Sequence, residues 1–328
     1  MNRNEDLKVD DFMSRATAGA LPKIYGAALL EAAQRDPRIV ALTADLTGPT
    51  ETDLIRDHLP DRYFNVGIAE ANMIGMAGGM AKCGDMPFAH SFCVFATRRP
   101  FDQIAMQVAY PKANVKIVGF IPGLTTALGV SHQAIDDIAL MRALPNMVVL
   151  DPRGPSQIRS AVHAVVAHDG PVYMRLKRPD KPLAADFQHT ELTIGRGEVL
   201  RDGDAGVVFA CGMMVDLALE AATRLADGGR RVAVVDLATI KPLDVQLVVE
   251  MARRSGVVVT AENHSIVGGL GSAVAEALGE AGIRTELRRV GVKDVFAEGG
   301  TSPYLFERYG LTAEAIIAAF EDARRAAG

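Results

Sequence analysis

The chain has 328 residues, a formal net charge of -5 at pH 7 and a sequence pI of about 5.8. This weak negative charge argues against nucleic acid or an anionic membrane as a partner. With 49% hydrophobic and 23% charged residues the composition is that of a globular protein, and the length predicts about two domains with a core each. Residues 1–12 contain no apolar stretch typical of a signal peptide, and no apolar run reaches the length of a membrane helix, so we expect a cytoplasmic protein.

The cysteines and the paired arginines indicate no site. Cys83, Cys93 and Cys211 are far apart in the sequence and lack the spacing of metal ligands, which is typical of reduced thiols in a cytosolic protein. The neighbouring arginines Arg98 and Arg99 are expected to be solvated surface residues rather than part of a phosphate-binding face.

Short apolar runs alternate with longer amphipathic stretches from residue 23 onward. The runs 39–42, 115–121, 147–150 and 172–176 are predicted to be buried strands. The stretches 23–34, 69–81, 133–143 and 155–167 are predicted to be the helices between them. Such alternation is typical of βαβ units and of a mainly parallel sheet.

A polar, proline-broken segment begins near Arg178 and predicts a linker that runs to about Ile194. A second alternating set follows, with predicted strands at 207–210, 232–235 and 257–260 and helices at 216–226, 243–254, 270–278 and 312–325. The glycine phrase 268–272 lacks the spacing of a dinucleotide loop and the lysine of a P-loop, which favours a tight strand-to-helix turn. We therefore predict an α/β protein with two doubly wound domains.

Glu70 is the residue that most strongly indicates a function. It is a lone carboxylate at the start of a run of Ala, Met, Ile and Gly that is suited to buried helix packing. A buried acid without a partner tends to take up a proton, so such residues are usually paired or functional. The alternative is an acid that stabilises the positive end of a helix dipole.

Two further segments accompany Glu70 in the sequence. They are His90 to Arg99, which contains Ser-Phe-Cys-Val-Phe, and Gly129 to Ala139, which contains Ser-His-Gln-Ala. In this order the three segments resemble the pyrimidine-binding domain of transketolases and of the related deoxyxylulose-phosphate synthases. The resemblance covers nearly the whole chain after residue 17 and is closest to the small-subunit form of the family. It implies an N-terminal tail (1–16), a pyrimidine-binding domain (17–180), a linker (181–194) and a transketolase C-terminal domain (195–328).

The resemblance implies a cofactor site for thiamine diphosphate. Glu70 matches the glutamate of the family phrase G-I-A-E-x-N-M, which binds N1′ of the aminopyrimidine ring and is catalytic. Phe92 and Phe95 match aromatic residues that wall this ring, although on their own they would be ascribed to a helical core. Asp45 matches an aspartate near the cofactor, and a turn residue at a strand end is an equally good interpretation.

His132 matches the catalytic histidine of the family that contacts the substrate. The resemblance implies that its ring forms a hydrogen bond to the carbonyl or hydroxyl of the ketose donor as charge develops. A group that titrates near neutral pH suits this role. The alternative interpretation of His132 is that of a lone histidine with a structural role only.

The substrate positions depart from the family. Leu128 stands where the family has an aspartate that binds a donor hydroxyl, and an apolar side chain cannot accept that hydrogen bond. Three phosphate-binding positions are occupied by Pro22, Pro49 and Phe120, and only Arg178 is retained. We therefore expect an atypical donor, such as an unusual ketose, a different anion or an unphosphorylated sugar.

The diphosphate half of the cofactor site is missing from the sequence. The family binds the diphosphate and Mg²⁺ through a G-D-G phrase followed by a distal asparagine, and no such phrase occurs here. We therefore expect a large partner subunit that carries the diphosphate-binding domain and Mg²⁺, in an α2β2 assembly.

The leading hypothesis is a subunit of a transketolase that transfers a two-carbon ketol unit from a ketose to an aldehyde. The alternatives are a specialised two-carbon transferase with a carrier-bound acceptor and a non-catalytic, transketolase-like interaction subunit. A β subunit of a 2-oxo acid dehydrogenase is a less suitable match, because the sequence motif around His132 follows the transketolase pattern. A nucleotide-binding protein would need a phosphate-loop signature, which the sequence lacks.

Overall fold

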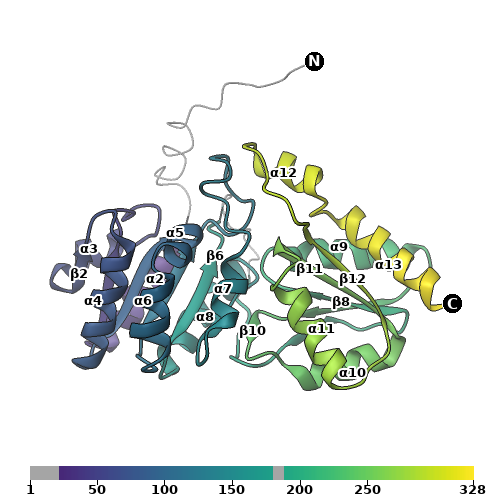
Figure 1. The fold of residues 1–328 in the computed structure, drawn as a ribbon, viewed down its shortest axis with the longest axis horizontal. Coiled ribbons are helices and arrows are strands. Elements are labelled where there is room, and N and C mark those ends of the chain that lie inside the picture. The colour runs from purple at the N-terminus through teal and green to yellow at the C-terminus, as the bar shows by residue number, and fades with distance from the viewer. Residues whose placement is uncertain (1–21, 180–187) are drawn as a thin grey trace, which may run out of the picture.

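A computed structural model describes residues 22–179 and 188–328 of the chain. The predicted N-terminal tail and residues 181–187 of the predicted linker lie outside the described residues, so the domain boundaries stay predictions. The described residues form two α/β domains, each built on one sheet (Figure 1). The fold class predicted from the sequence is confirmed. No helix in the described ranges is both long and apolar enough to cross a lipid bilayer.

The first domain contains a sheet of seven strands in the order β10-β5-β6-β4-β3-β1-β2. All neighbouring strands are parallel except β10, which is antiparallel to β5. The strands are β1 (Ile39–Thr43), β2 (Tyr63–Asn65), β3 (Met86–Phe92), β4 (Lys116–Phe120), β5 (Val148–Leu150), β6 (Val172–Leu176) and β10 (Thr239–Lys241). The helical segments are α2 (Ile24–Arg35), α3 (Asp53–His58), η1 (Pro60–Arg62), α4 (Glu70–Lys82), α5 (Cys93–Arg98), α6 (Phe101–Gln103), the π-helical η2 (Ile104–Ala109), α7 (Asp137–Ala143) and α8 (Pro155–Ala167).

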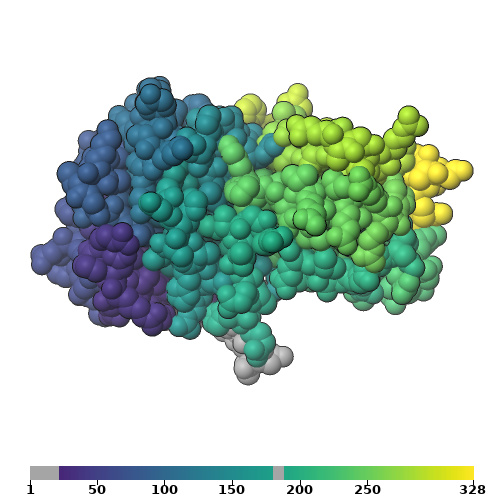
Figure 2. Space-filling view, turned by 90° about the horizontal axis from the view of Figure 1, so that it is seen from below, coloured from purple at the N-terminus to yellow at the C-terminus, as the bar shows by residue number. Residues whose placement is uncertain are grey.

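The second domain contains a sheet in the order β12-β11-β8-β9-β7, parallel except for the edge strand β7. Its strands are β7 (Glu198–Arg201), β8 (Gly206–Ala210), β9 (Val232–Asp236), β11 (Val257–Ser265) and β12 (Glu286–Val292). Its helices are α9 (Met214–Asp227), α10 (Val245–Ser255), α11 (Leu270–Glu280), α12 (Ser302–Tyr309) and α13 (Ala313–Ala327). The two domains appear as adjoining lobes in the space-filling view (Figure 2).

Most predicted elements are present, and the differences have local causes. The predicted helix 133–143 begins only at Asp137, because Ala134 pairs with Gly123 in a short bridge that holds the preceding residues in a loop. Strand β3 was not predicted, since Pro87 argues against a central strand, yet all seven of its residues are buried. Phe92 therefore ends a strand, and it does not share a helix with Phe95.

The predicted strand-to-helix turn at the glycine phrase 268–272 is confirmed. It connects β11 to α11, and the carboxylate of Glu262 accepts hydrogen bonds from the backbone N–H groups of Leu270 (2.7 Å) and Gly271 (2.8 Å). A carboxylate at the first turn satisfies N–H groups that have no partner within the helix. The buried carboxylate of Glu262 therefore has a structural role as a helix cap.

A buried arginine joins the two domains. Arg175, on β6, is fully buried, and its guanidinium lies 2.9 Å from Asp137 and 3.1 Å from Asp151. It also donates to the carbonyl oxygens of Ala134 (3.3 Å) and of Asn263 in the second domain (3.2 Å). Buried charges are tolerated when they are paired, and here two carboxylates face the guanidinium. The pairing is not complete, because Nε of Arg175 lies 2.9 Å from Asp137 without forming an aligned hydrogen bond.

Replacing Arg175 by Met should strongly destabilise the chain. The variant leaves Asp137 and Asp151 buried without their cation, and breaking such a buried pair typically costs about 3–5 kcal/mol. Urea unfolding of the wild type and the variant measures this loss. The control is Arg254→Met, which removes an exposed ion pair to Asp202 and should cost less than about 1 kcal/mol. Equal losses in the two variants would contradict a central role for Arg175.

Candidate active site

The predicted site residues follow the carboxyl ends of neighbouring parallel strands. In an open α/β sheet this edge is where ligands bind, because the connecting loops meet there. The strands β1, β2, β3, β4 and β6 are followed or ended by Asp45, Glu70, Phe92, His132 and Arg178, respectively. The topology therefore brings segments that are far apart in the sequence to one edge of the first sheet.

Glu70 is the first residue of α4 and is only 3% exposed. Its position at the helix start places the carboxylate near the positive end of the helix dipole. The carboxylate is not alone, however, because Nη1 of Arg99 donates to Oε1 of Glu70 at 2.7 Å. The partner that the sequence did not reveal is thus an arginine at the end of α5.

Arg98 and Arg99 are partly exposed, with 31% and 46% of their side chains accessible, and both also contact residues near the site. Arg98 forms an ion pair with Asp136 at 2.8 Å. The guanidinium carbon of Arg99 lies 4.0 Å from the centre of the Phe95 ring, in addition to the ion pair with Glu70. Phe95 and Arg99 are four residues apart, a spacing that places side chains on the same helical face, so this signal was available in the sequence.

Two phenylalanines and a histidine form a compact aromatic cluster beside Glu70 and Arg99. The ring centres of Phe92 and Phe95 are 6.1 Å apart. The ring of His132 meets Phe95 edge-on at 5.1 Å and lies 6.2 Å from Phe92. These distances are typical of favourable aromatic contacts. The predicted residues Glu70, Phe92, Phe95 and His132 are therefore linked by contacts, directly or through Arg99.

His132 is half-buried, and Nδ1 of its ring lies 2.9 Å from the hydroxyl oxygen of Ser131. Burial lowers the pKa of His132, and the positive charge of Arg99 lowers it further. Both effects disfavour the protonated ring. The neutral imidazole, with one donor and one acceptor nitrogen, is thus the form favoured at neutral pH.

The loop between β4 and α7 holds His132 in place. Gly123 has a φ of 55°, and a side chain there would collide with Asn263 of the second domain. Asn263 accepts a hydrogen bond from the backbone N–H of Leu124 (3.0 Å) and donates to the carbonyl of Pro122 (3.1 Å). Leu128 lies half-buried in the same loop. The second domain therefore shapes the loop that carries the predicted substrate residues.

Arg178 is oriented by a buried acid that the sequence analysis did not identify. Its Nε donates to Oε1 of Glu51 at 3.1 Å, and Glu51 is 1% exposed. Oε2 of Glu51 accepts from the backbone N–H of Gly26 at 2.9 Å. Burial raises the pKa of Glu51, while these two partners favour its charged form.

Two predicted positions lie apart from the aromatic cluster. Asp45 is exposed and exchanges hydrogen bonds of 3.1 Å with the side chain of Asn65, in keeping with its interpretation as a turn residue. Phe120 is 1% exposed and packs against Tyr25 in the core, with ring centres 5.4 Å apart. A cofactor role for Asp45 stays a prediction.

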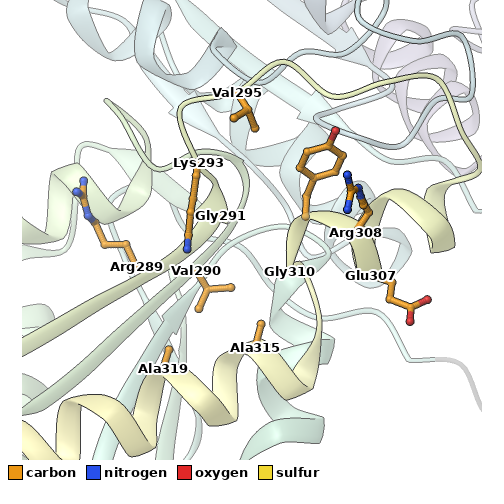
Figure 3. A pocket seen from close by; sticks show the side chains of 11 residues that line it. Arg289, Val290, Gly291, Lys293, Val295, Glu307, Arg308, Gly310, Ala315 and Ala319 are labelled. Carbon is orange, nitrogen blue, oxygen red and sulfur yellow. The ribbon is translucent and has the colours of Figure 1, made fainter.

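A hollow of about 520 Å³ lies on the second domain, between the end of β12 and the helices α12 and α13 (Figure 3). Its lining includes Arg289, Lys293 and Arg308, and none of the predicted site residues. This hollow is therefore separate from the predicted site residues of the first domain.

Comparisons with known proteins agree with this geometry. Residues 18–182 match the family described as "Transketolase, pyrimidine binding domain", and residues 195–316 match "Transketolase, C-terminal domain". The chain is 45% identical over 321 residues to the "6-deoxy-6-sulfo-D-fructose transketolase subunit SqwH" of Clostridium sp. (strain MSTE9), covering 97% of each chain. It is 41% identical over 296 residues to the "Putative transketolase C-terminal section" of Methanocaldococcus jannaschii, covering 90% of this chain and 93% of that one.

The fold of the chain is also similar to that of a solved structure. The structure "Split gene transketolase, inactive beta4 tetramer" is 46% identical in sequence, has a TM-score of 0.84 and covers 92% of this chain and 97% of that chain. The fold and the site edge define a domain that binds a pyrimidine ring, which implies thiamine diphosphate as the cofactor. The chain belongs to the transketolase family and is a transketolase-type transferase subunit.

The pKa of His132 is expected to lie below its usual value of about 6.5. Replacing Arg99 by Gln removes a repelling charge and should raise this pKa part of the way, because the burial remains. Titration of the histidine ring signals by NMR measures both values. The control Arg159→Gln, on the distant α8, should leave the pKa unchanged. A pKa at or above the usual value, or no response to Arg99→Gln, would contradict the electrostatic account.

Proposed function

We propose that the chain is the small subunit of a split transketolase, which transfers a two-carbon ketol unit from a ketose to an aldehyde. The observation that carries this proposal is the meeting of Glu70, Phe92, Phe95 and His132 at one sheet edge. The likeness to a named transketolase subunit over 97% of both chains supports it.

The described residues fit the aminopyrimidine half of thiamine diphosphate. When bound, the cofactor supplies the acidic C2–H bond and the electron sink that cleavage of a ketose requires. Glu70 offers a buried, fixed carboxylate to the N1′ position of the ring. Phe92 and Phe95 offer apolar surfaces for the ring faces, and such surfaces also keep water from the carboxylate.

His132 is proposed to bind the donor sugar. If the Ser131 hydroxyl donates to Nδ1, the single proton of the neutral ring resides on Nε2. Nε2 can then donate to the carbonyl or hydroxyl oxygen of the donor as negative charge develops there. The anchored loop and the contact with Phe95 hold the ring in one orientation.

The remaining half of the site is proposed to come from a large partner subunit. That subunit would carry the diphosphate-binding domain and Mg²⁺, and two copies of each chain would form an α2β2 assembly. The absence of a G-D-G phrase from the sequence supports this proposal, because the family binds the diphosphate and Mg²⁺ through that phrase. The related split-gene protein that was solved as an inactive tetramer of β chains supports it further.

The donor is proposed to be a ketose with a sulfonate at its far end. The related Clostridium protein is named for 6-deoxy-6-sulfo-D-fructose, and Arg178 is the retained anion-binding residue. Because Glu51 lies 3.1 Å from Arg178, it offsets part of the positive charge. A sulfonate carries one negative charge, whereas a phosphate ester carries about 1.5–2 at pH 7. The pair of Arg178 and Glu51 therefore favours the less charged group.

Replacing Glu70 by Gln should abolish most turnover of the assembled enzyme without loss of the fold. The amide retains a hydrogen bond but cannot balance positive charge at N1′. Deuterium exchange at C2 of the bound cofactor should slow by about 10²-fold or more. The control is Glu276→Gln, which removes an exposed carboxylate on α11 of the second domain that pairs with Arg142 on α7. Exchange at the wild-type rate would show that Glu70 is only structural.

The assembled enzyme should have a higher kcat/KM for a sulfonated six-carbon ketose than for xylulose 5-phosphate. Arg178→Met should raise KM about 10–100-fold for anionic donors, because a charged hydrogen bond is worth about 1.5–3 kcal/mol, and should leave an uncharged ketose nearly unaffected. Arg159→Met, a surface variant on α8, is the control. In the reverse direction, Leu128→Asp with Pro22→Arg should shift preference toward ketose phosphates. Xylulose 5-phosphate as the best donor of the wild type would refute this assignment.

A further inference from the structure

The guanidinium of Arg99 contacts both Glu70 and Phe95, the two groups that are proposed to bind the cofactor ring. Its Nη1 donates to the Glu70 carboxylate at 2.7 Å, and its carbon lies 4.0 Å from the centre of the Phe95 ring. The Arg99 side chain is 46% exposed, whereas that of Glu70 is 3% exposed. Arg99 therefore covers the carboxylate and the aromatic ring from the solvent side.

A guanidinium and a protonated aminopyrimidine are bound by the same two kinds of group, a carboxylate and an aromatic ring. Each is flat and positively charged, each donates N–H groups within its plane, and each stacks by its face on an aromatic ring. A carboxylate near the edge and a phenylalanine at the face satisfy both groups. Arg99 already occupies Oε1 of Glu70 and one face of the Phe95 ring, so a cofactor ring that needs these same groups has to displace it.

We propose that Arg99 is a placeholder that occupies the pyrimidine half-site of the free chain and leaves it when the cofactor ring binds. This proposal rests on the proposed cofactor roles of Glu70 and Phe95. Without a cofactor, the pair with Arg99 keeps a buried carboxylate from being left without a partner. The arginine follows the last residue of α5 and is half in solvent, so its side chain can turn away while the helix stays intact.

The placeholder competes with the cofactor, so its removal should strengthen cofactor binding. Calorimetric titration of thiamine diphosphate with Mg²⁺ into the assembled complex of this chain and its partner subunit measures the Kd. For Arg99→Met the Kd should fall about tenfold, since one half-exposed ion pair and one cation–π contact no longer have to be broken. The control Arg35→Met removes a surface arginine that pairs with Glu31 at the same distance of 2.7 Å, and its Kd should be unchanged.

A second measurement follows the ion pair itself. Thermal unfolding of the wild type, Glu70→Gln, Arg99→Met and the double variant gives the coupling between the two residues. The coupling should be present in the cofactor-free complex and absent in the cofactor-loaded complex. If Arg99→Met does not fold, Arg99→Gln replaces it in both measurements with the same expected direction.

The outcomes separate this proposal from the proposed function. A complex that binds thiamine diphosphate but shows an unchanged or higher Kd on removal of Arg99 overturns the placeholder alone. The same conclusion follows if the coupling with Glu70 persists in the loaded complex, because Arg99 then stays on the carboxylate. A wild-type complex that does not bind thiamine diphosphate at all overturns the proposed function, and the placeholder with it.

Discussion

The buried pairing of Arg175 with Asp137 and Asp151 is the interaction on which the rest of the structure depends. Arg175 is part of β6, Asp137 opens α7, and Asp151 follows β5. The same guanidinium holds the backbone of the loop that carries His132 and a backbone carbonyl of the second domain. Because unpaired charges are costly in such an interior, the two domains and the loop have to assemble together.

This constraint explains why a domain without predicted chemistry is joined to the one that carries the site. Asn263, from β11, fixes the start of the loop, and the side chain of Gln133 donates to the carbonyl of Glu298 at 2.9 Å. Strand β10 also crosses over from the second half of the chain to extend the first sheet. The second domain thus positions His132 without itself supplying one of the predicted catalytic residues.

Local patterns in the sequence predicted much of the fold. The alternation of strands and helices predicted β1, β4, β5 and β6 of the first sheet and β8, β9 and β11 of the second, whereas β2, β3, β7, β10 and β12 were not predicted. Helix α8 has the bounds that its apolar period predicted. Strand β3 was not predicted because Pro87 and a central histidine interrupt its apolar run. Strand β10 was not predicted because its three residues are too few to show a periodic pattern. The position of Glu70 at a helix start was predicted, since small apolar residues follow it directly.

The partners of the site residues could not be predicted in the same way. Arg175 stands in an otherwise apolar strand, and nothing local identifies Asp137 and Asp151 as its partners, which are 38 and 24 residues away. The pairing of Glu70 with Arg99 spans 29 residues and depends on how α4 and α5 meet at the sheet edge. Such contacts are set by tertiary packing, which a single sequence does not specify.

The central claim is that this chain holds one half of a cofactor site and acts only with a partner. The most direct measurement compares thiamine diphosphate binding and ketol transfer by the chain alone, by the partner subunit alone and by their mixture. The account predicts tight binding and turnover for the mixture only, because the proposed assembly has the carboxylate on this chain and the diphosphate site on the partner. Tight binding or transfer by this chain alone would contradict it.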